Sequence, residues 1–287
     1  MKEKNTVELK KIANSIRQDI IKMLVQAGSG HSAGPLGLAD IFTALYFCIL
    51  NHRPKQPLWP DRDRLFLSCG HNCPVLYATL AQAGYFPREE LSTLRQTGTR
   101  LQGHPHIGEL PGVENTSGPL GQGLSQAFGA ALAAKMDHKK HRIFVISSDG
   151  EQDEGQTWEA LMFAGKMKLS NVTVILDRNN IQIDGPTERV MPLEPLREKY
   201  EAFGWHVIEV DGHNIPQVIH ACNESRAIAE KPTMIIAHTI PGKDVSFMES
   251  NYLWHGSPPN KEQAEAALKE LKKIREQILS ECTTICS

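Results

Sequence analysis

Residues 147–185 read SSDGEQDEGQTWEALMFAGKMKLSNVTVILDRNNIQIDG. The segment opens at the end of an apolar run, Arg142 to Ser147, which predicts a buried strand. A helical pattern follows, and then a second apolar strand, Val172 to Leu176. A strand–helix–strand unit of this length places two parallel strands side by side. Their carboxyl ends then meet at one edge of the sheet, where open α/β sheets bind ligands.

A polar side chain follows each of these strands: Asp149 after the first and Asn179 after the second, thirty positions later. We expect the two to face each other across the crevice. Carboxylate and amide oxygens suit Mg²⁺, which takes its other oxygens from phosphates and water. The segment therefore predicts a magnesium–phosphate anchor. The alternative is that Asp149-Gly150 is only a turn and Asn179-Asn180 only a polar loop, since Asp-Gly pairs mark many turns.

Taken whole, the unit resembles the thiamine diphosphate-binding motif. Its residues EGQTWEA and IDG are similar to those of the transketolase family. The resemblance implies that Asp149, Asn179 and the carbonyl of Ile181 hold Mg²⁺, or Ca²⁺ or Mn²⁺ in its place, against the cofactor diphosphate, with Gly150 beside it. One position departs from the family pattern, because Ser148 stands where Gly-Asp-Gly would have its first glycine. That glycine lets the backbone pass close to the phosphates, so we expect a slightly altered approach rather than a loss of binding.

The composition excludes several classes of protein. A length of 287 residues with 40% apolar residues supports a substantial core, and the net charge of −2 offers no basic field for nucleic acid or a membrane surface. The N-terminus, MKEKNTVELKK, has no apolar stretch typical of a secretory signal, and no run has the length of a membrane span. We therefore expect a cytoplasmic protein that binds neither nucleic acid nor membranes.

Cysteine usage agrees with a reducing compartment, since the six cysteines form no CxxC pair. The side chains of Cys69, His71 and Cys73 offer an alternative zinc site, but a second ligand pair at zinc spacing is missing. Free thiols are the simpler interpretation. The cysteines are Cys48, Cys69, Cys73, Cys222, Cys282 and Cys286.

Helical and strand patterns alternate along the chain, which predicts an α/β fold with a mostly parallel sheet covered by helices on both faces, in one domain over residues 1–287. Helical spacing covers 6–27, 38–50, 74–83, 124–136, 193–203, 215–229 and a last helix from Asn260, where Gln263 suits a capping box. Further strands are expected near 61–67, 205–210 and 233–237. Between them, residues 91–123 are rich in Gly, Pro and polar side chains, and long irregular segments tend to be functional.

Four histidines, His31, His71, His104 and His255, each lie beside Gly or Pro in an expected loop. A lone loop histidine is usually just solvated, but histidine is also the usual proton carrier near neutral pH. Their motifs look like the histidine motifs of transketolases. The resemblance implies that His31, His104 and His255 line the substrate channel and handle hydroxyls and protons, and that His71 contacts the diphosphate.

The same resemblance assigns further contacts to the cofactor. Gly118-Pro119-Leu120 looks like the loop that contacts the aminopyrimidine, and Ile183 matches an apolar contact, although a buried isoleucine is the default anywhere. Glu154 matches an acid that meets the other subunit near the pyrimidine. An alternative for Glu154 is a charge at a helix N-terminus, where the helix dipole favours it.

The resemblance covers the chain from Leu9 to the last helix, but only the family's first, diphosphate-binding domain. It therefore implies the N-terminal subunit of a split transketolase, which works with a C-terminal subunit that carries the pyrimidine-binding domain, in an α₂β₂ assembly. The implied reaction moves a two-carbon ketol unit from a ketose, or ketose phosphate, to an aldose acceptor. Phosphorylated pentoses, branched sugars and sulfonated ketoses all stay open as substrates.

Two alternatives stay open as well. One is another thiamine diphosphate enzyme, such as a 2-oxo acid dehydrogenase component or a 1-deoxyxylulose phosphate synthase. The other is a non-catalytic module on the same fold, since a fold does not fix a function.

Overall fold

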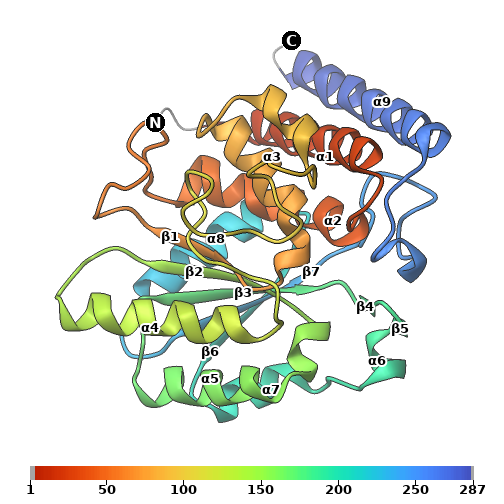
Figure 1. Cartoon of the computed structure of the whole chain (residues 1–287). Helices are drawn as coiled ribbons and strands as arrows, with labels where there is room; N and C mark the ends of the chain where they lie inside the picture. The colour runs from red at the N-terminus through yellow and green to blue at the C-terminus, as the bar shows by residue number, and fades with distance from the viewer. Residues whose placement is uncertain (1–3, 286–287) are drawn as a thin grey trace.

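The computed structural model describes residues 4–285, with side chains up to residue 280. A five-stranded sheet in the order β1-β2-β3-β7-β6 forms its centre, and every neighbouring pair in this sheet is parallel (Figure 1). A short antiparallel hairpin, β4-β5, stands apart from it. The predicted α/β class with a mostly parallel sheet is confirmed.

The strands are β1 (Arg64–Leu67), β2 (Ile143–Ser148), β3 (Val172–Arg178), β4 (Ile181–Gln182), β5 (Gly185–Pro186), β6 (His206–Asp211) and β7 (Thr233–His238). The helices are α1 (Thr6–Ala27), α2 (Ala33–Ala44), α3 (Cys73–Ala83), α4 (Gln122–Met136), α5 (Gly155–Lys166), α6 (Thr187–Val190), α7 (Leu196–Ala202), α8 (Ile215–Ala227) and α9 (Lys261–Ile285).

Helices cover both faces of the sheet, as expected for parallel strands. In Figure 1, α1, α2, α3 and α9 lie above the sheet and α4, α5 and α7 lie below it. Alternate residues of β2 feed two separate cores: Phe144 and Ile146 pack with the upper layer, and Ile143 and Val145 with the lower one. The central strands β2 and β3 are therefore buried on both faces, which explains why they read as nearly continuous apolar runs.

Local signals set the ends of the long helices. The Asn5 side chain accepts from the Glu8 backbone N–H at 2.8 Å to start α1, and Gly28 ends it in the left-handed region at φ 62°. At α9, Asn260 and Gln263 exchange two backbone–side-chain hydrogen bonds of 2.9 Å each, so the predicted capping box is confirmed.

Several predicted elements differ from the structure. The second helix begins at Ala33 rather than Leu38 and closes with a π-helical stretch, Leu45–Ile49. Helix α7 begins at Leu196 rather than Leu193, because a residue before proline disfavours helical angles and Pro195 immediately precedes the helix. The β4-β5 hairpin and α6 were not predicted, since two-residue strands and a four-residue helix are too short to show a period.

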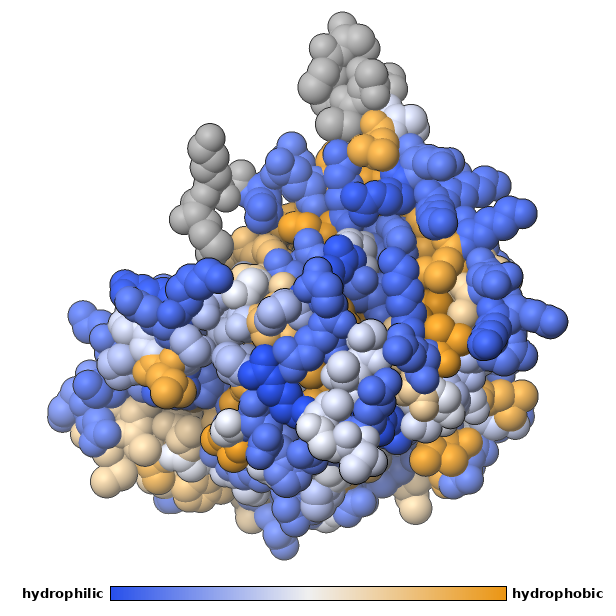
Figure 2. Space-filling view, turned by 45° about the horizontal axis from the view of Figure 1, so that its top comes forward, coloured by the Kyte–Doolittle hydropathy of each residue, from blue (hydrophilic) through white to orange (hydrophobic). Residues whose placement is uncertain are grey.

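Hydrophilic side chains cover much of the face shown in Figure 2, with hydrophobic residues in separate patches between them. Across residues 4–285, no helix is both long and apolar enough to cross a lipid bilayer. The thiols of Cys69, Cys73 and Cys222 are buried and unbridged. Cys282 and Cys286 lie outside the residues whose side chains are described.

Candidate functional site

The carboxyl ends of β2 and β3 lie side by side, because Ser148 pairs with Asp177 in the parallel register. The backbone N–H of Asp149 donates to the Asp177 carbonyl at 3.2 Å, which extends the pairing by one residue. Asp149 and Asn179 are both buried and line one cavity of about 210 Å³. The two candidate ligands predicted from the sequence are therefore brought together at the edge of the sheet.

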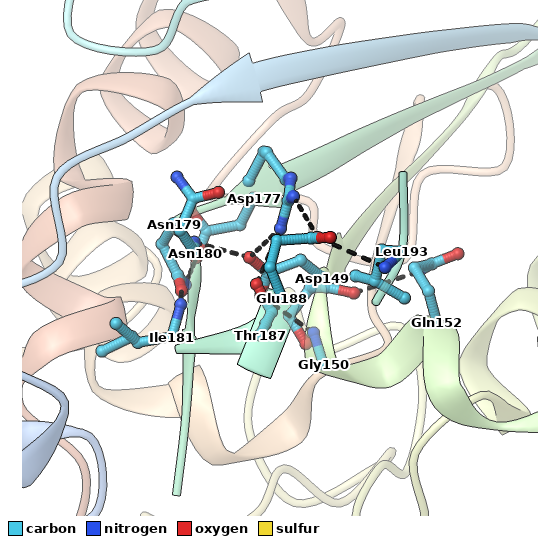
Figure 3. A network of polar contacts seen from close by, with 12 residues as sticks. Asp149, Gly150, Gln152, Asp177, Asn179, Asn180, Ile181, Thr187, Glu188 and Leu193 are labelled. Carbon is cyan, nitrogen blue, oxygen red and sulfur yellow. Dashed lines mark hydrogen bonds and ion pairs between the residues drawn. The ribbon is translucent and has the colours of Figure 1, made fainter. Parts of the chain in front are cut away.

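Asp149 is held from several sides (Figure 3). One carboxylate oxygen accepts from the Gly150 backbone N–H at 2.8 Å, and the other accepts from the Asn180 N–H at 2.6 Å. The second oxygen also faces the Arg178 guanidinium at 3.2 Å. Burial and the neighbouring Asp177 nevertheless raise the pKa of Asp149 to about 7. The groups around Asp149 therefore do not fully balance the negative charge of its carboxylate.

Asn179 and Ile181 complete the candidate cation site. The Asn179 Oδ1 atom accepts from the Ile181 backbone N–H at 3.0 Å, and its Nδ2 donates to Asp177 at 2.8 Å, which fixes the amide orientation. Ile181 lines the same cavity as Asp149 and Asn179. A carboxylate, an amide oxygen and a backbone carbonyl fit a hard divalent cation.

Among the described residues, no group of three or more His, Cys, Asp or Glu side chains is arranged to hold a metal ion. The zinc alternative at Cys69, His71 and Cys73 therefore finds no support. The two thiols instead contact backbone carbonyls, Cys69 Sγ that of Ile146 at 3.7 Å and Cys73 Sγ that of Gly103 at 3.1 Å.

Three histidine rings gather at the same cavity, which His31, His71 and His255 all line. Their ring centroids lie 4.8 Å apart for His31 and His71, 5.4 Å for His31 and His255, and 5.3 Å for His71 and His255. The loops are tied together, since the Ser32 hydroxyl donates to the Ser257 carbonyl at 2.5 Å. The cluster thus comes from three distant parts of the chain.

The cluster is electrostatically neutral at physiological pH. Burial, followed by the neighbouring His255, lowers the pKa of His31 to about 4, and burial also lowers the pKa of His71 and of His255. The Nδ1 atoms of His31 and His255 are buried and have no hydrogen-bond partner among the described residues. Such atoms fit a bound ligand that completes their hydrogen bonding.

His104 lies next to this cluster but does not line the cavity. It belongs to the electrostatic surroundings of both His31 and His71. Its loop is joined to the glycine-rich turn, because the Ser117 N–H donates to the Pro105 carbonyl at 3.1 Å.

The remaining predicted residues divide into two groups. Leu120 and Ile183 line the cavity, and Ile183 is 67% exposed, so the default of a buried isoleucine is wrong. Gly118, Pro119 and Glu154 do not line it. Glu154 is exposed and forms the N-cap of α5, the position expected for its alternative role.

Glu151 is a residue that the sequence reasoning missed. It is fully buried, and its carboxylate accepts from the Ser68 hydroxyl at 2.5 Å, the Gly121 N–H at 2.6 Å, the Ser147 hydroxyl at 2.6 Å and the Ser148 N–H at 3.2 Å. It therefore joins the loop after β1, the end of β2 and the start of α4, and it also lines the cavity. No local signal distinguishes it from the acids Asp153 and Glu154 that follow.

The geometry defines an α/β protein with a ligand cavity at the carboxyl edge of its sheet, and the comparisons identify its family. Residues 8–275 match the family described as transketolase, thiamine diphosphate binding domain. The 6-deoxy-6-sulfo-D-fructose transketolase subunit of Clostridium sp. (strain MSTE9) is 45% identical over 93% of this chain and 97% of that protein. An apulose-4-phosphate transketolase subunit of Phocaeicola vulgatus is 41% identical over 96% of this chain and 97% of that protein.

Full-length transketolases match over less than half of their own length. Human transketolase is 36% identical over 92% of this chain and 42% of that protein. The crystal structure of Campylobacter jejuni transketolase has a TM-score of 0.88 and 36% identity, over 94% of this chain and 43% of the other. The chain belongs to the transketolase family and corresponds to its thiamine diphosphate-binding domain.

Proposed function

We propose that this chain is the N-terminal subunit of a two-chain transketolase, which transfers a two-carbon ketol unit from a ketose to an aldose acceptor. One observation carries the proposal: the Asp149–Asn179 pair and the histidine cluster share one cavity. A cation–phosphate anchor beside a group of neutral proton acceptors suits cofactor-dependent cleavage next to a sugar hydroxyl.

We propose that Asp149, Asn179 and the Ile181 carbonyl hold Mg²⁺, or Ca²⁺ or Mn²⁺, against the cofactor diphosphate, beside Gly150. Thiamine diphosphate, when bound, supplies the electron sink that allows the C2–C3 bond of a ketose to break. The raised pKa of Asp149 supports the cation, because a positive charge at this place would stabilise the buried carboxylate.

The histidines supply the hydrogen bonds and the proton transfers. His31, His104 and His255 are proposed to bind the sugar hydroxyls, and an imidazole that is neutral at pH 7 can accept the proton of the C3 hydroxyl. The lowered pKa of His31 keeps its ring neutral at pH 7, so a ring nitrogen can accept a hydrogen bond from a sugar hydroxyl. His71 is proposed to contact the diphosphate, and Gly118, Pro119, Leu120 and Ile183 to contact the rest of the cofactor.

A partner subunit completes the proposed enzyme. The chain is proposed to form one domain, and the pyrimidine-binding domain would come from a C-terminal subunit. The two relatives described above are named as transketolase subunits, and the match with this chain covers 97% of each of them. An α₂β₂ assembly in the cytoplasm is proposed, with Glu154 facing the partner. The relatives act, by their names, on a sulfonated and a phosphorylated sugar, so we propose a ketose with an anionic end as the donor.

The test begins with capture of the tagged chain from its own host. The co-purifying partner is expressed together with the chain, and two-carbon transfer is assayed with Mg²⁺ and thiamine diphosphate, using xylulose 5-phosphate, 6-deoxy-6-sulfofructose and apulose 4-phosphate in turn as donors. Transfer by the mixture and by neither chain alone is expected. Equal turnover by this chain alone would refute the split enzyme, and pyruvate decarboxylation in place of transfer would identify another thiamine diphosphate enzyme.

A further inference from the structure

Ser32 stands between His31 and helix α2, and it is fully buried. A serine at a helix N-cap ordinarily accepts a hydrogen bond from a backbone N–H of the first turn. Ser32 makes no such bond, and its backbone lies in the right-handed helical region, at φ −103° and ψ −48°. Its hydroxyl instead donates to the Ser257 carbonyl at 2.5 Å. The hydroxyl therefore joins two loops and does not cap its own helix.

The Ser32 hydrogen bond links the segments that carry two of the clustered histidines. Ser32 directly follows His31, and Ser257 lies two residues after His255. A Cβ on Gly256 would lie 3.7 Å from His31 Nε2, so the backbone beside His255 packs against the His31 ring. The hydroxyl of Ser32 thus holds together the two stretches of backbone from which these rings project.

Other contacts hold the two rings less directly. Their Nδ1 atoms are buried, and no described residue offers either of them a hydrogen bond. The rings of His31 and His255 meet edge to face with their centroids 5.4 Å apart. Another hydrogen bond between the two segments runs from the Gly242 N–H to the Ala33 carbonyl at 2.8 Å, but Gly242 lies well before His255 in the chain. Of these two links, the Ser32 hydroxyl is the one close to both histidines in sequence.

We propose that Ser32 is a positioning residue, which sets the spacing of the His31 and His255 rings for the sugar. The inference rests on the sugar-binding role of these histidines in the proposed function, and it adds the contact that fixes their spacing. A misplacement of about 1 Å can cost about a hundredfold in rate, so the loss of this link should lower kcat/KM for the ketose by about tenfold or more. The affinity for thiamine diphosphate should stay unchanged, because Ser32 does not line the cavity.

The test uses the purified two-chain complex. It measures kcat and KM with each of the three donors named above, and the Kd of thiamine diphosphate in excess Mg²⁺ by calorimetry. Ser32→Ala removes the hydroxyl with little change in volume, and we expect kcat/KM to fall by about tenfold or more while the Kd stays within about twofold. Ser32→Cys, which is close in size and has a weak S–H donor, should give an intermediate kcat/KM.

Ser225→Ala is the matched control. Ser225 is also fully buried, and its hydroxyl donates to a backbone carbonyl, that of Cys222, at 2.8 Å. Its loss should lower thermal stability, as the loss of Ser32 also should, but it should leave kcat/KM unchanged. The control therefore separates a role in positioning from the cost of removing any buried hydroxyl.

A double-mutant cycle with His255→Ala tests whether Ser32 acts through the histidine. In the wild-type background Ser32→Ala should lower kcat/KM by about tenfold or more, and in the His255→Ala background by less than about twofold. Additive losses would overturn the inference, because Ser32 would then act independently of His255. If Ser32→Ala does not fold, Ser32→Cys takes its place in the cycle.

The remaining outcomes are also decisive. An unchanged kcat/KM in Ser32→Ala would overturn the inference, and so would a rise in the Kd of thiamine diphosphate that accounts for the whole loss. A wild-type complex that transfers no ketol unit would refute the proposed function separately. The crystal structures of the wild type and of Ser32→Ala would then decide the inference, and it fails if the His31 and His255 centroids stay 5.4 Å apart in the variant.

Discussion

At the scale of single residues, Asp149 shows how burial prepares a side chain for a ligand. Its carboxylate is 1% exposed and forms an ion pair with the Arg178 guanidinium, yet burial raises its pKa to about 7. Arg178 is shared with Glu188 and Glu194 at 2.7 and 2.9 Å, so its charge is divided among three acids. A divalent cation would supply the missing charge.

We predict that Asp149→Asn lowers the affinity of the complex for Mg²⁺ and thiamine diphosphate by about a hundredfold or more, since even residues behind a metal ligand contribute ten- to a hundredfold. The fold should persist, because Arg178 keeps its two glutamate partners. Calorimetric titration measures the effect, with Asp137→Asn on the exposed end of α4 as the control. Unchanged affinity in Asp149→Asn would remove this residue from the site.

A second prediction at this scale concerns pH and His31. The pKa of His31 is about 4 in the folded chain against 6.5 ordinarily, so below pH 6.5 the unfolded chain binds a proton that the folded chain does not. The free energy of unfolding should therefore fall as the pH drops from 6.5 to 4. The contribution of His31 to this fall is at most about 3 kcal/mol. Urea unfolding at several pH values measures the slope, which should be shallower in His31→Gln and unchanged in the exposed control His220→Gln. Equal slopes in all three proteins would contradict the assignment.

At the scale of secondary-structure elements, buried polar contacts hold the strand ends and helix starts around the cavity. Glu151 joins the loop after β1, the end of β2 and the start of α4 through four hydrogen bonds. Because Glu151 also lines the cavity, one buried carboxylate both fixes the carboxyl edge of the sheet and forms part of the cavity wall.

We predict that Glu151→Ala lowers the free energy of unfolding by about 3 kcal/mol or more, because it leaves several buried donors without an acceptor. Glu151→Gln should lower the free energy of unfolding by less than Glu151→Ala does. It should still lower it, since the glutamine amide turns an N–H toward those donors. Urea denaturation measures the loss, and Glu159→Ala on the exposed face of α5 should change little. A loss below about 1 kcal/mol in Glu151→Ala would mean that the network does not stabilise the edge.

Packing of α5 gives another prediction. A Cβ on Gly165 would lie 2.0 Å from the Phe203 carbonyl oxygen, so α5 meets the turn after α7 only because this residue is glycine. Gly165→Ala should destabilise the protein by about 1–3 kcal/mol. In contrast, Gly129→Ala in α4, where a Cβ meets nothing within 4 Å, should stabilise it by about 0.5–1 kcal/mol. Thermal unfolding of the pair checks both signs, and the same sign for both variants would refute the packing argument.

At the scale of the whole molecule, the cavity wall carries an apolar side chain exposed to solvent, that of Ile183, which is 67% exposed. The chain accounts for 42% of human transketolase, so most of the family's length lies elsewhere. The proposed partner would bring the pyrimidine side of the site to this cavity.

We therefore predict that specific activity depends on concentration. Dilution of the complex should reduce turnover per active site once the concentration approaches the dissociation constant of the two subunits, as mass action requires. Adding an excess of this chain alone should restore activity, whereas the Asp149→Asn variant should compete without restoring it. Specific activity that is constant on dilution over several orders of magnitude would show that one chain suffices or that the subunits do not separate.

Much of the fold follows from local patterns. The bounds of α1 were predicted from helical spacing, and α9 was predicted with its capping box, because a capping residue and its target lie three positions apart. The parallel sheet followed from alternating apolar runs. Short elements such as the β4-β5 hairpin were not predicted, since a strand of two residues shows no hydrophobic period.

For the site, the sequence by itself determined the Asp149–Asn179 pair, because one strand–helix–strand unit places the ends of adjacent strands together. Only the tertiary structure decided that His31, His71 and His255 meet within 5.4 Å and that the buried Glu151 lines the same cavity. The physical reason is that loops far apart in sequence converge through the packing of whole layers. That packing depends on many apolar contacts together, and no local spacing encodes it.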